Sequence, residues 1–243
     1  MPNPTAAMLV IGDEILSGRT RDANMHHLAQ KLTEHGIDLC EVRVVSDDAP
    51  AIITAVRALS GQYTHVFTSG GIGPTHDDIT ADCIAEAFGR AIDVRDDARK
   101  LLADLCAARG VELTTERLRM ARIPEGAALI DNAASVAPGF TVENVHVMAG
   151  VPRVFEAMVA WLLPRLAAGQ RRLSQNLRVM QAESEISGPL RDIAAAHPDL
   201  SLGSYPFSEN GQFGANIVIR GTDPAAIDAA MAQLKEAFPN GTT

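Results

Sequence analysis

The sequence predicts an α/β fold: a three-layer αβα sandwich with a mostly parallel central sheet, followed by a small α+β (βαββα) subdomain. Two observations carry this prediction. In roughly the first two thirds of the 243 residues, short β-branched and apolar runs alternate with segments whose apolar residues recur at helical spacing. Hydrophobic residues make up 47% of the chain, so a sheet buried on both faces can form.

The expected elements follow one another closely along the first part of the chain. The predicted strands are residues 7–11, 37–45, 64–68, 128–130 and 145–148. The predicted helices run from Asp22 or Asn24 to Gly36, from Pro50 to about Leu59, over 79–88, over 96–108, over 115–122 and onward from Pro152. Strands that alternate with helices in this way favour a parallel sheet covered on both faces.

A polar, glycine-containing segment at residues 168–172 is the expected domain boundary. We therefore expect one domain over residues 1–168 and a second over residues 173–243. In the second, strands are predicted at 177–180, 200–205 and 213–220, and helices around Ile186–Ile193 and from Asp223 onward.

A glycine-rich segment joins the central predicted strand to the helix at 79–88. Its residues of chemical interest are Ser69, Gly70, Gly71, Gly73, Pro74, Thr75, Asp77, Asp78 and Thr80. Glycines at such a turn permit positive φ and close approach of a ligand, and the following helix start favours an anion such as phosphate. The two carboxylates would repel a phosphate unless a divalent cation lies between them, or unless one of them only caps the helix.

Two other predicted strands also end in acidic or glycine-containing segments. Gly12, Asp13 and Glu14 follow the first strand, and Asp47 and Asp48 follow the second. Parallel sheets bind ligands at the carboxyl ends of their strands, so we expect these segments and the glycine-rich loop to meet in one pocket.

The glycine-rich loop, residues 70–80, resembles the signature loop of the molybdenum-cofactor biosynthesis (molybdopterin-binding) family. Its Pro-Thr-x-Asp-Asp form is most similar to the N-terminal domain of the competence/damage-inducible protein A branch. The similarity extends over roughly the first two thirds of the chain and includes Gly12–Leu16, Asp22 with Asn24, Asn132, Ala137–Phe140 and Gly150–Pro152. The chain departs from the family where Ala149 replaces the usual proline before Gly150.

The resemblance implies roles for individual residues. It implies catalysis by Asp78 and Asp47, a possible Mg²⁺ held by Asp78 and Asp77, and ligand contacts from Gly12, Asp13, Glu14, Asn24, Ser69, Gly70, Gly71, Gly73, Pro74, Thr75, Thr80, Gly139, Gly150 and Pro152. Local alternatives remain. Asp78 and Asp47 have the positions of helix caps, Asp22 and Asn24 those of caps at the start of the next helix, and Thr80 that of a residue satisfying a helix start. The Pro-Gly pair at Gly139 is typical of a turn.

The ligand implied by the resemblance is a small molecule that bears phosphate, either molybdopterin or an adenine nucleotide. The implied function is Mg²⁺-dependent pyrophosphate cleavage of an ADP-ribose-like or FAD-like phosphoanhydride, with a non-catalytic molybdopterin-binding carrier or sensor as the alternative. Neither the deamidase activity of full-length competence proteins nor adenylyl transfer to molybdopterin is expected. The resemblance also implies a homo-oligomer.

Composition limits the partners and the compartment. The formal charge of -9 argues against non-specific nucleic-acid binding, which needs clustered Lys and Arg. The arginines at 117, 119 and 122 are interpreted first as a solvated basic face and second as phosphate ligands. Cys40, Cys83 and Cys106 are expected to be buried apolar residues. No secretory signal or membrane-spanning run is evident, so a cytoplasmic protein without membrane contact is expected.

Overall fold

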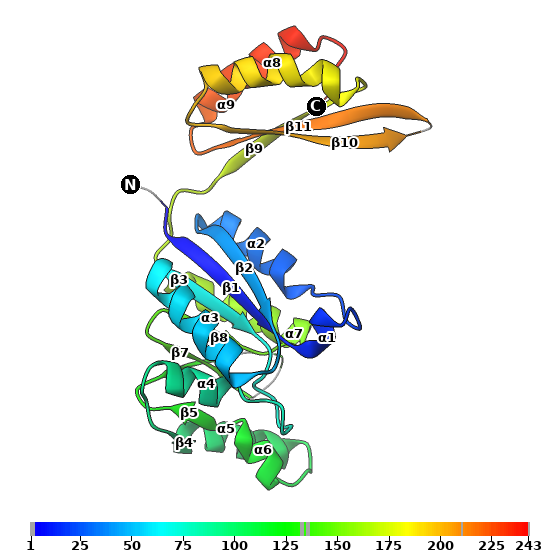
Figure 1. The fold of residues 1–243 in the computed structure, drawn as a ribbon. Coiled ribbons are helices and arrows are strands. Elements are labelled where there is room, and N and C mark those ends of the chain that lie inside the picture. Colours follow the sequence, from blue (N-terminus) through cyan, green and yellow to red (C-terminus); the bar gives the residue numbers. More distant parts are fainter. Residues whose placement is uncertain (1–2, 132–133, 135–136, 210, 243) are drawn as a thin grey trace. The chain divides into compact units, whose positions relative to one another are not determined.

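The computed structural model describes residues 3–131, 134, 137–209 and 211–242. Its chain divides into two compact units, residues 1–169 and 170–243 (Figure 1). Each unit is described below by itself.

The first unit is built on a mixed six-stranded sheet with the strand order β2-β1-β3-β8-β7-β6 in the described chain. Its strands are β1 (Thr5–Ile11), β2 (Asp38–Val45), β3 (His65–Ser69), β6 (Ala128–Ile130), β7 (Gly139–Val142) and β8 (Val145–Met148). The pairs β1–β2, β1–β3 and β3–β8 are parallel, whereas β7 is antiparallel to both β8 and β6. The predicted mostly parallel sheet is therefore confirmed.

Helices cover both faces of this sheet, as expected for a three-layer fold (Figure 1). They are α1 (Asp13–Leu16), α2 (Asn24–His35), α3 (Ala49–Gln62), α4 (Thr80–Ala87), α5 (Asp96–Ala108), α6 (Thr115–Arg119) and α7 (Pro152–Leu162), followed by the 3₁₀ turn Leu163–Arg165. Successive side chains of β1 point to opposite faces of the sheet and belong to two separate hydrophobic cores. Leu9 packs in the core that contains α3, α4 and α5, whereas Met8 packs in the core that contains α2 and α7.

Two segments near the middle of the chain differ from the prediction. The expected turn at Gly139 is strand β7, because an added Cβ there would lie 2.4 Å from the carbonyl oxygen of Val147 and glycine alone allows this close packing. The helix expected over 115–122 ends at Arg119. Arg122–Pro124 instead form β5, which pairs with the unpredicted β4 (Ile92–Val94). Pro124 disfavours helical geometry in the residue before it.

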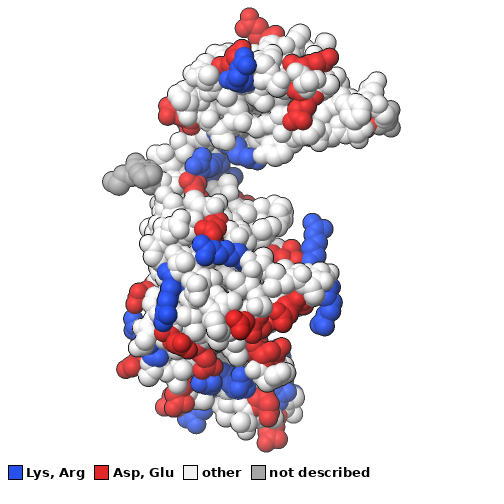
Figure 2. All heavy atoms as spheres, viewed as in Figure 1, with Lys and Arg blue, Asp and Glu red and all other residues white. Residues whose placement is uncertain are grey.

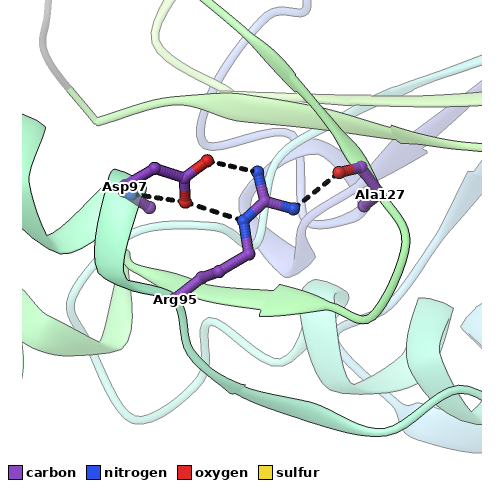
Figure 3. Close-up of polar contacts among 4 residues, drawn as sticks. Arg95, Asp97 and Ala127 are labelled. Atoms are coloured by element: carbon purple, nitrogen blue, oxygen red, sulfur yellow. Dashed lines mark hydrogen bonds and ion pairs between the residues drawn. The ribbon is translucent and has the colours of Figure 1, made fainter.

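Arg95 fastens the start of α5 to the turn before β6 (Figure 3). Its guanidinium donates to both carboxylate oxygens of Asp97 at 2.7 and 2.9 Å, and to the carbonyl oxygen of Ala127 at 2.5 Å. The same carboxylate accepts from the N–H of Ala98, so it also serves the first turn of the helix. The Arg95 guanidinium lowers the pKa of the Asp97 carboxyl below its usual value.

The second unit has the predicted βαββα order. It contains β9 (Leu173–Val179), α8 (Glu183–Ala196), β10 (Ser201–Glu209), β11 (Gln212–Gly221) and α9 (Pro224–Ala237). The antiparallel sheet has the order β10-β11-β9, and both helices pack on one face through a core centred on Ile217 and Leu234. β9 begins four residues earlier than the predicted 177–180 strand, because pairing with β11 extends to Leu173.

Surface features complete the fold. The prediction that all three cysteines are buried is wrong for Cys40, which is exposed on β2, and holds for Cys83 and Cys106. β2 is an edge strand, so alternate side chains can face water.

On the face drawn in Figure 2, Lys and Arg lie among Asp and Glu. None of the described helices has the length and apolar character required to cross a lipid bilayer.

Candidate functional site

The carboxyl ends of β1, β2, β3 and β8 meet at one edge of the sheet. Gly12, which follows β1, donates its N–H to the carbonyl oxygen of Val45 at the end of β2, at 3.1 Å. Gly70, which follows β3, donates its N–H to the carbonyl oxygen of Met148 at the end of β8, also at 3.1 Å. These bonds continue the parallel pairing past the strands and bring the four following loops together.

The loops enclose a cavity of about 470 Å³, a size suited to a nucleotide-like molecule. Ten residues expected from the sequence line it: Gly12, Glu14, Asp47, Gly70, Gly71, Gly73, Pro74, Asp77, Asp78 and Gly150. Apolar side chains that were not among the predicted ligand contacts complete the wall: Ile11, Ile72, Met120, Ala137, Ala149, Val151 and Val154. Ile72 was recognisable as the apolar residue between two loop glycines, but no local pattern indicates that Met120 or Val154 reaches this site.

The remaining expected residues do not line this cavity. They are Asp13, Asn24, Ser69, Thr75, Thr80, Gly139 and Pro152. Gly139 belongs to the interior of β7, and Pro152 is the first residue of α7. Asn132 lies outside the described residues.

The first two loop glycines have conformations that other residues rarely adopt. Gly70 has φ 110°, and a Cβ there would lie 2.2 Å from the carbonyl oxygen of Ile11. Gly71 has φ 69°, and a Cβ there would lie 2.0 Å from the hydroxyl oxygen of Thr80. The loop therefore requires glycine for backbone geometry and for space.

Thr80 stabilises the glycine loop through hydrogen bonds to its backbone. It is fully buried, its hydroxyl donates to the carbonyl oxygen of Gly70 at 3.1 Å, and its N–H donates to the carbonyl oxygen of Gly71 at 3.0 Å. Of the two uses considered for Thr80, the structure thus shows the backbone-satisfying one.

Asp78 does not cap helix α4. The helix starts at Thr80, Ile79 precedes it, and no side chain caps it. Instead Asp78 Oδ2 accepts hydrogen bonds from the N–H of Thr75 at 2.8 Å and from its hydroxyl at 2.5 Å. An added Cβ at Gly73 would lie 2.6 Å from the same carboxylate oxygen. The carboxylate therefore folds back over the glycine loop and borders the cavity.

Asp47 does not cap a helix either. The cap of α3 is Asp48, which accepts from the N–H of Ala51 at 3.1 Å. Asp47 accepts instead from the N–H of Asp13 at 2.9 Å, across from β2 to the loop after β1. Burial raises the pKa of the Asp47 carboxyl, and repulsion from Asp13, Glu14 and Asp77 adds to the rise although the Asp13 N–H opposes it.

The charged residues that line the cavity in the described structure are all acidic. Glu14, Asp47, Asp77 and Asp78 contribute carboxylates, while the described lining residues include no Lys, Arg or His. A phosphate-bearing ligand would be repelled unless a cation accompanied it. Within the described chain, no three acidic, histidine or cysteine residues converge on one point that would hold a metal. The carboxylates of the cavity lining nevertheless fit Mg²⁺, because this ion commonly takes one or two carboxylates together with substrate phosphates and water.

Arg119 and Arg122 of the α6–β5 segment are bonded to other residues and do not form the solvated face that was expected first. Arg119 donates to the carbonyl oxygen of Asp78 at 3.3 Å, and its Nε is buried without a partner in the described structure. Arg122 forms a two-pronged ion pair with Asp82 on α4, at 3.0 and 2.7 Å. These bonds connect the α6–β5 segment to the glycine loop and to helix α4, a placement that the sequence did not reveal.

Comparisons with known proteins divide the chain in two. Residues 7–168 match a family model described as "Probable molybdopterin binding domain", and residues 171–243 match one described as "FAD synthase, middle domain".

Individual relatives match both parts. A "Probable FAD synthase" from Caenorhabditis elegans is 33% identical over 256 aligned residues, covering 96% of this chain and 49% of that protein. The chain thus spans about half the length of the curated relatives of that name that it matches. A protein from Archaeoglobus fulgidus is 34% identical over 200 residues, covering 82% of this chain and 84% of its own length.

A solved structure of the protein CinA, of unknown function, from Thermoplasma acidophilum has a TM-score of 0.61 and 34% identity. It covers 68% of this chain and 99% of its own. The resemblance predicted from the glycine-rich loop is therefore confirmed.

Proposed function

Because the chain belongs to the family of probable molybdopterin-binding domains, we propose that its cavity binds a phosphate-bearing adenine nucleotide or molybdopterin. We further propose that it hydrolyses, with Mg²⁺, a phosphoanhydride of the ADP-ribose or FAD type. The supporting observation is the combination in one cavity of a glycine loop with four carboxylates and no basic lining residue among those described.

The loop backbone binds the phosphates in this proposal. The N–H groups of Gly71, Ile72 and Gly73 donate to no other described residue, and all three residues line the cavity. Three consecutive N–H groups at a strand-to-helix turn would donate to phosphate oxygens in this proposal. The apolar wall around Met120 and Val154 provides a surface for a planar ring.

The acidic residues divide into two groups. Asp78 and Asp77 would hold Mg²⁺, which when bound neutralises charge on the phosphoanhydride oxygens. Asp47 accepts a proton from the attacking water, since burial and its acidic neighbours make its carboxylate more basic. The water oxygen bonds to one phosphorus, the bridging P–O bond breaks, and two monophosphates leave. From ADP-ribose the products are AMP and ribose 5-phosphate.

The test compares the wild type, Asp78→Asn and Asp104→Asn, where Asp104 is an exposed carboxylate on α5. Hydrolysis of ADP-ribose and of FAD is followed by product chromatography with Mg²⁺ and with EDTA. Asp78→Asn should lose on the order of 10²-fold or more in turnover, the scale of removing one electrostatic stabiliser. Its melting temperature should change little, because an Asn oxygen can still accept from Thr75. Asp104→Asn should match the wild type.

Each alternative outcome has a definite meaning. Wild-type turnover in Asp78→Asn would remove Asp78 from the reaction. Binding of molybdopterin or nucleotide without any Mg²⁺-dependent product would favour the second candidate, a non-catalytic binding module. That candidate is supported by the molybdopterin-binding description of the matched family.

A further inference from the structure

Asn24 is a buried amide that joins two walls of the cavity without lining it. It is the first residue of α2 and only 3% exposed. Its Nδ2 donates to the hydroxyl of Ser69 at 2.8 Å and to the carbonyl oxygen of Gly150 at 2.8 Å. Ser69 ends β3, directly before the glycine loop, and Gly150 lies in the loop after β8.

The chemistry of these partners fixes the orientation of the amide. The Gly150 carbonyl can only accept, so the Asn24 atom that faces it must be the NH₂ group. Both of its N–H bonds are then used, and Oδ1 is buried without a partner among the described residues. A buried amide with an unsatisfied oxygen costs stability. An apolar residue here would leave the buried hydroxyl of Ser69 and the carbonyl of Gly150 without this donor, so the two donated bonds are the contribution of the amide.

The two walls are in close backbone contact at this point. An added Cβ at Gly150 would lie 3.2 Å from the Cα of Gly70, and the Gly70 N–H donates to Met148 in the same wall. A shift of Gly150 toward Gly70 would therefore displace the first glycine of the glycine loop. The amide of Asn24 bonds on both sides of this contact.

We infer that Asn24 is a positioning residue that clamps the loop after β8 to the end of β3, and so keeps the glycine-loop N–H groups oriented for a phosphate. This role acts through Ser69 and Gly150, and the predicted contact between Asn24 and the ligand stays a prediction. The inference deepens the proposed function, on which its ligand-binding consequence rests.

The chain offers a matched control at the opposite end of the sheet. Asn144 lies before β8, and its Nδ2 donates to the carbonyl oxygens of Ser60 and Tyr63 at 2.9 and 2.8 Å. Replacing Asn144 with Ala therefore removes two comparable bonds without touching the cavity. A general loss of stability and a loss of positioning can thus be separated.

The experiment measures amide hydrogen exchange by mass spectrometry on the full chain in the wild type, Asn24→Ala, Ser69→Ala and Asn144→Ala. In Asn24→Ala, peptides covering residues 70–79 and 149–151 should exchange on the order of tenfold faster, the effect of losing buried hydrogen bonds. Ser69→Ala, which removes one of the two bonds, should give a smaller change in the same peptides. Asn144→Ala should leave these peptides unchanged and affect residues 60–66.

Binding of ADP-ribose and FAD is measured on the same proteins by calorimetry. Asn24→Ala should raise the Kd about tenfold or more, and Asn144→Ala should not. Unchanged exchange in 70–79 after Asn24→Ala, or an equal change after Asn144→Ala, would overturn the inference. If Asn24→Ala does not fold, Ser69→Ala decides by the same criterion. If the wild type binds neither nucleotide, the proposed function fails, while the exchange data still decide whether Asn24 positions the loop.

Discussion

His146 should lower the stability of the first unit in mild acid. The residue lies on β8, is 3% exposed, and packs against the ring of Phe67 with centroids 5.0 Å apart. Its Nε2 lies 3.1 Å from Nδ1 of His65, and its Nδ1 lies 3.0 Å from the hydroxyl oxygen of Thr141. Burial, with a smaller contribution from His65, lowers the pKa of His146 to about 3.

The sign and size of the effect follow from proton linkage. An unfolded histidine has a pKa near 6.5, so below that pH the unfolded chain binds a proton that the folded His146 does not. The free energy of unfolding therefore falls as pH decreases from about 6.5 toward 3, by roughly 1.4 kcal/mol for each pH unit. Between pH 7.5 and pH 5 the loss from His146 alone is about 2 kcal/mol.

The assay uses urea unfolding at pH 7.5 and pH 5, followed by the fluorescence of Trp161. This single tryptophan of the chain lies on α7 and thus reports on the first unit. His146→Gln should lose about 2 kcal/mol less than the wild type between the two pH values, whatever its stability at pH 7.5. His76→Gln, which changes a fully exposed histidine, should follow the wild type. Equal pH sensitivity of the wild type and His146→Gln would refute the reasoning.

Three further predictions concern the loop, the domains and the assembly. Gly71→Ala should lower the free energy of unfolding by about 1–3 kcal/mol and weaken nucleotide binding. Gly110 also has a positive φ, of 63°, but open space around its Cβ position, so Gly110→Ala should show a smaller loss of stability and unchanged binding. Residues 1–169 should unfold cooperatively as an isolated fragment in a thermal scan, because their sheet and two cores are complete without the second unit; a soluble fragment with no transition would place the boundary elsewhere. In sedimentation, the full chain should form a dimer or trimer at micromolar concentration, and a strict monomer would contradict the expected self-association.

Features that depend on short-range patterns were predictable from the sequence. The strand preceding the glycine loop, the helix after it and the βαββα order of the second unit follow from apolar periodicity and glycine or proline stops. The meeting of Gly12, Asp47 and the glycine loop followed as well, because parallel strands place their carboxyl ends at one edge.

The partners of individual side chains required the tertiary structure. The sequence presents Asp47 as a candidate cap of the helix that follows it. Only the tertiary structure shows that Asp47 accepts from the N–H of Asp13, and that Asp48 caps α3 by accepting from the N–H of Ala51. Gly139 has the sequence context of a turn, yet packing against β8 makes it a strand.

Contacts between distant segments explain the residues that sequence reasoning placed wrongly or missed. Asn24 is separated from Gly150 by 126 positions, and Arg119 from Asp78 by 41. No periodicity connects such pairs, because they meet only when several strands and helices pack together. The local patterns of the chain thus determined the layers of the fold and the edge of the sheet at which the candidate site forms. Tertiary packing decided which side chains line that site and which support its loops through hydrogen bonds.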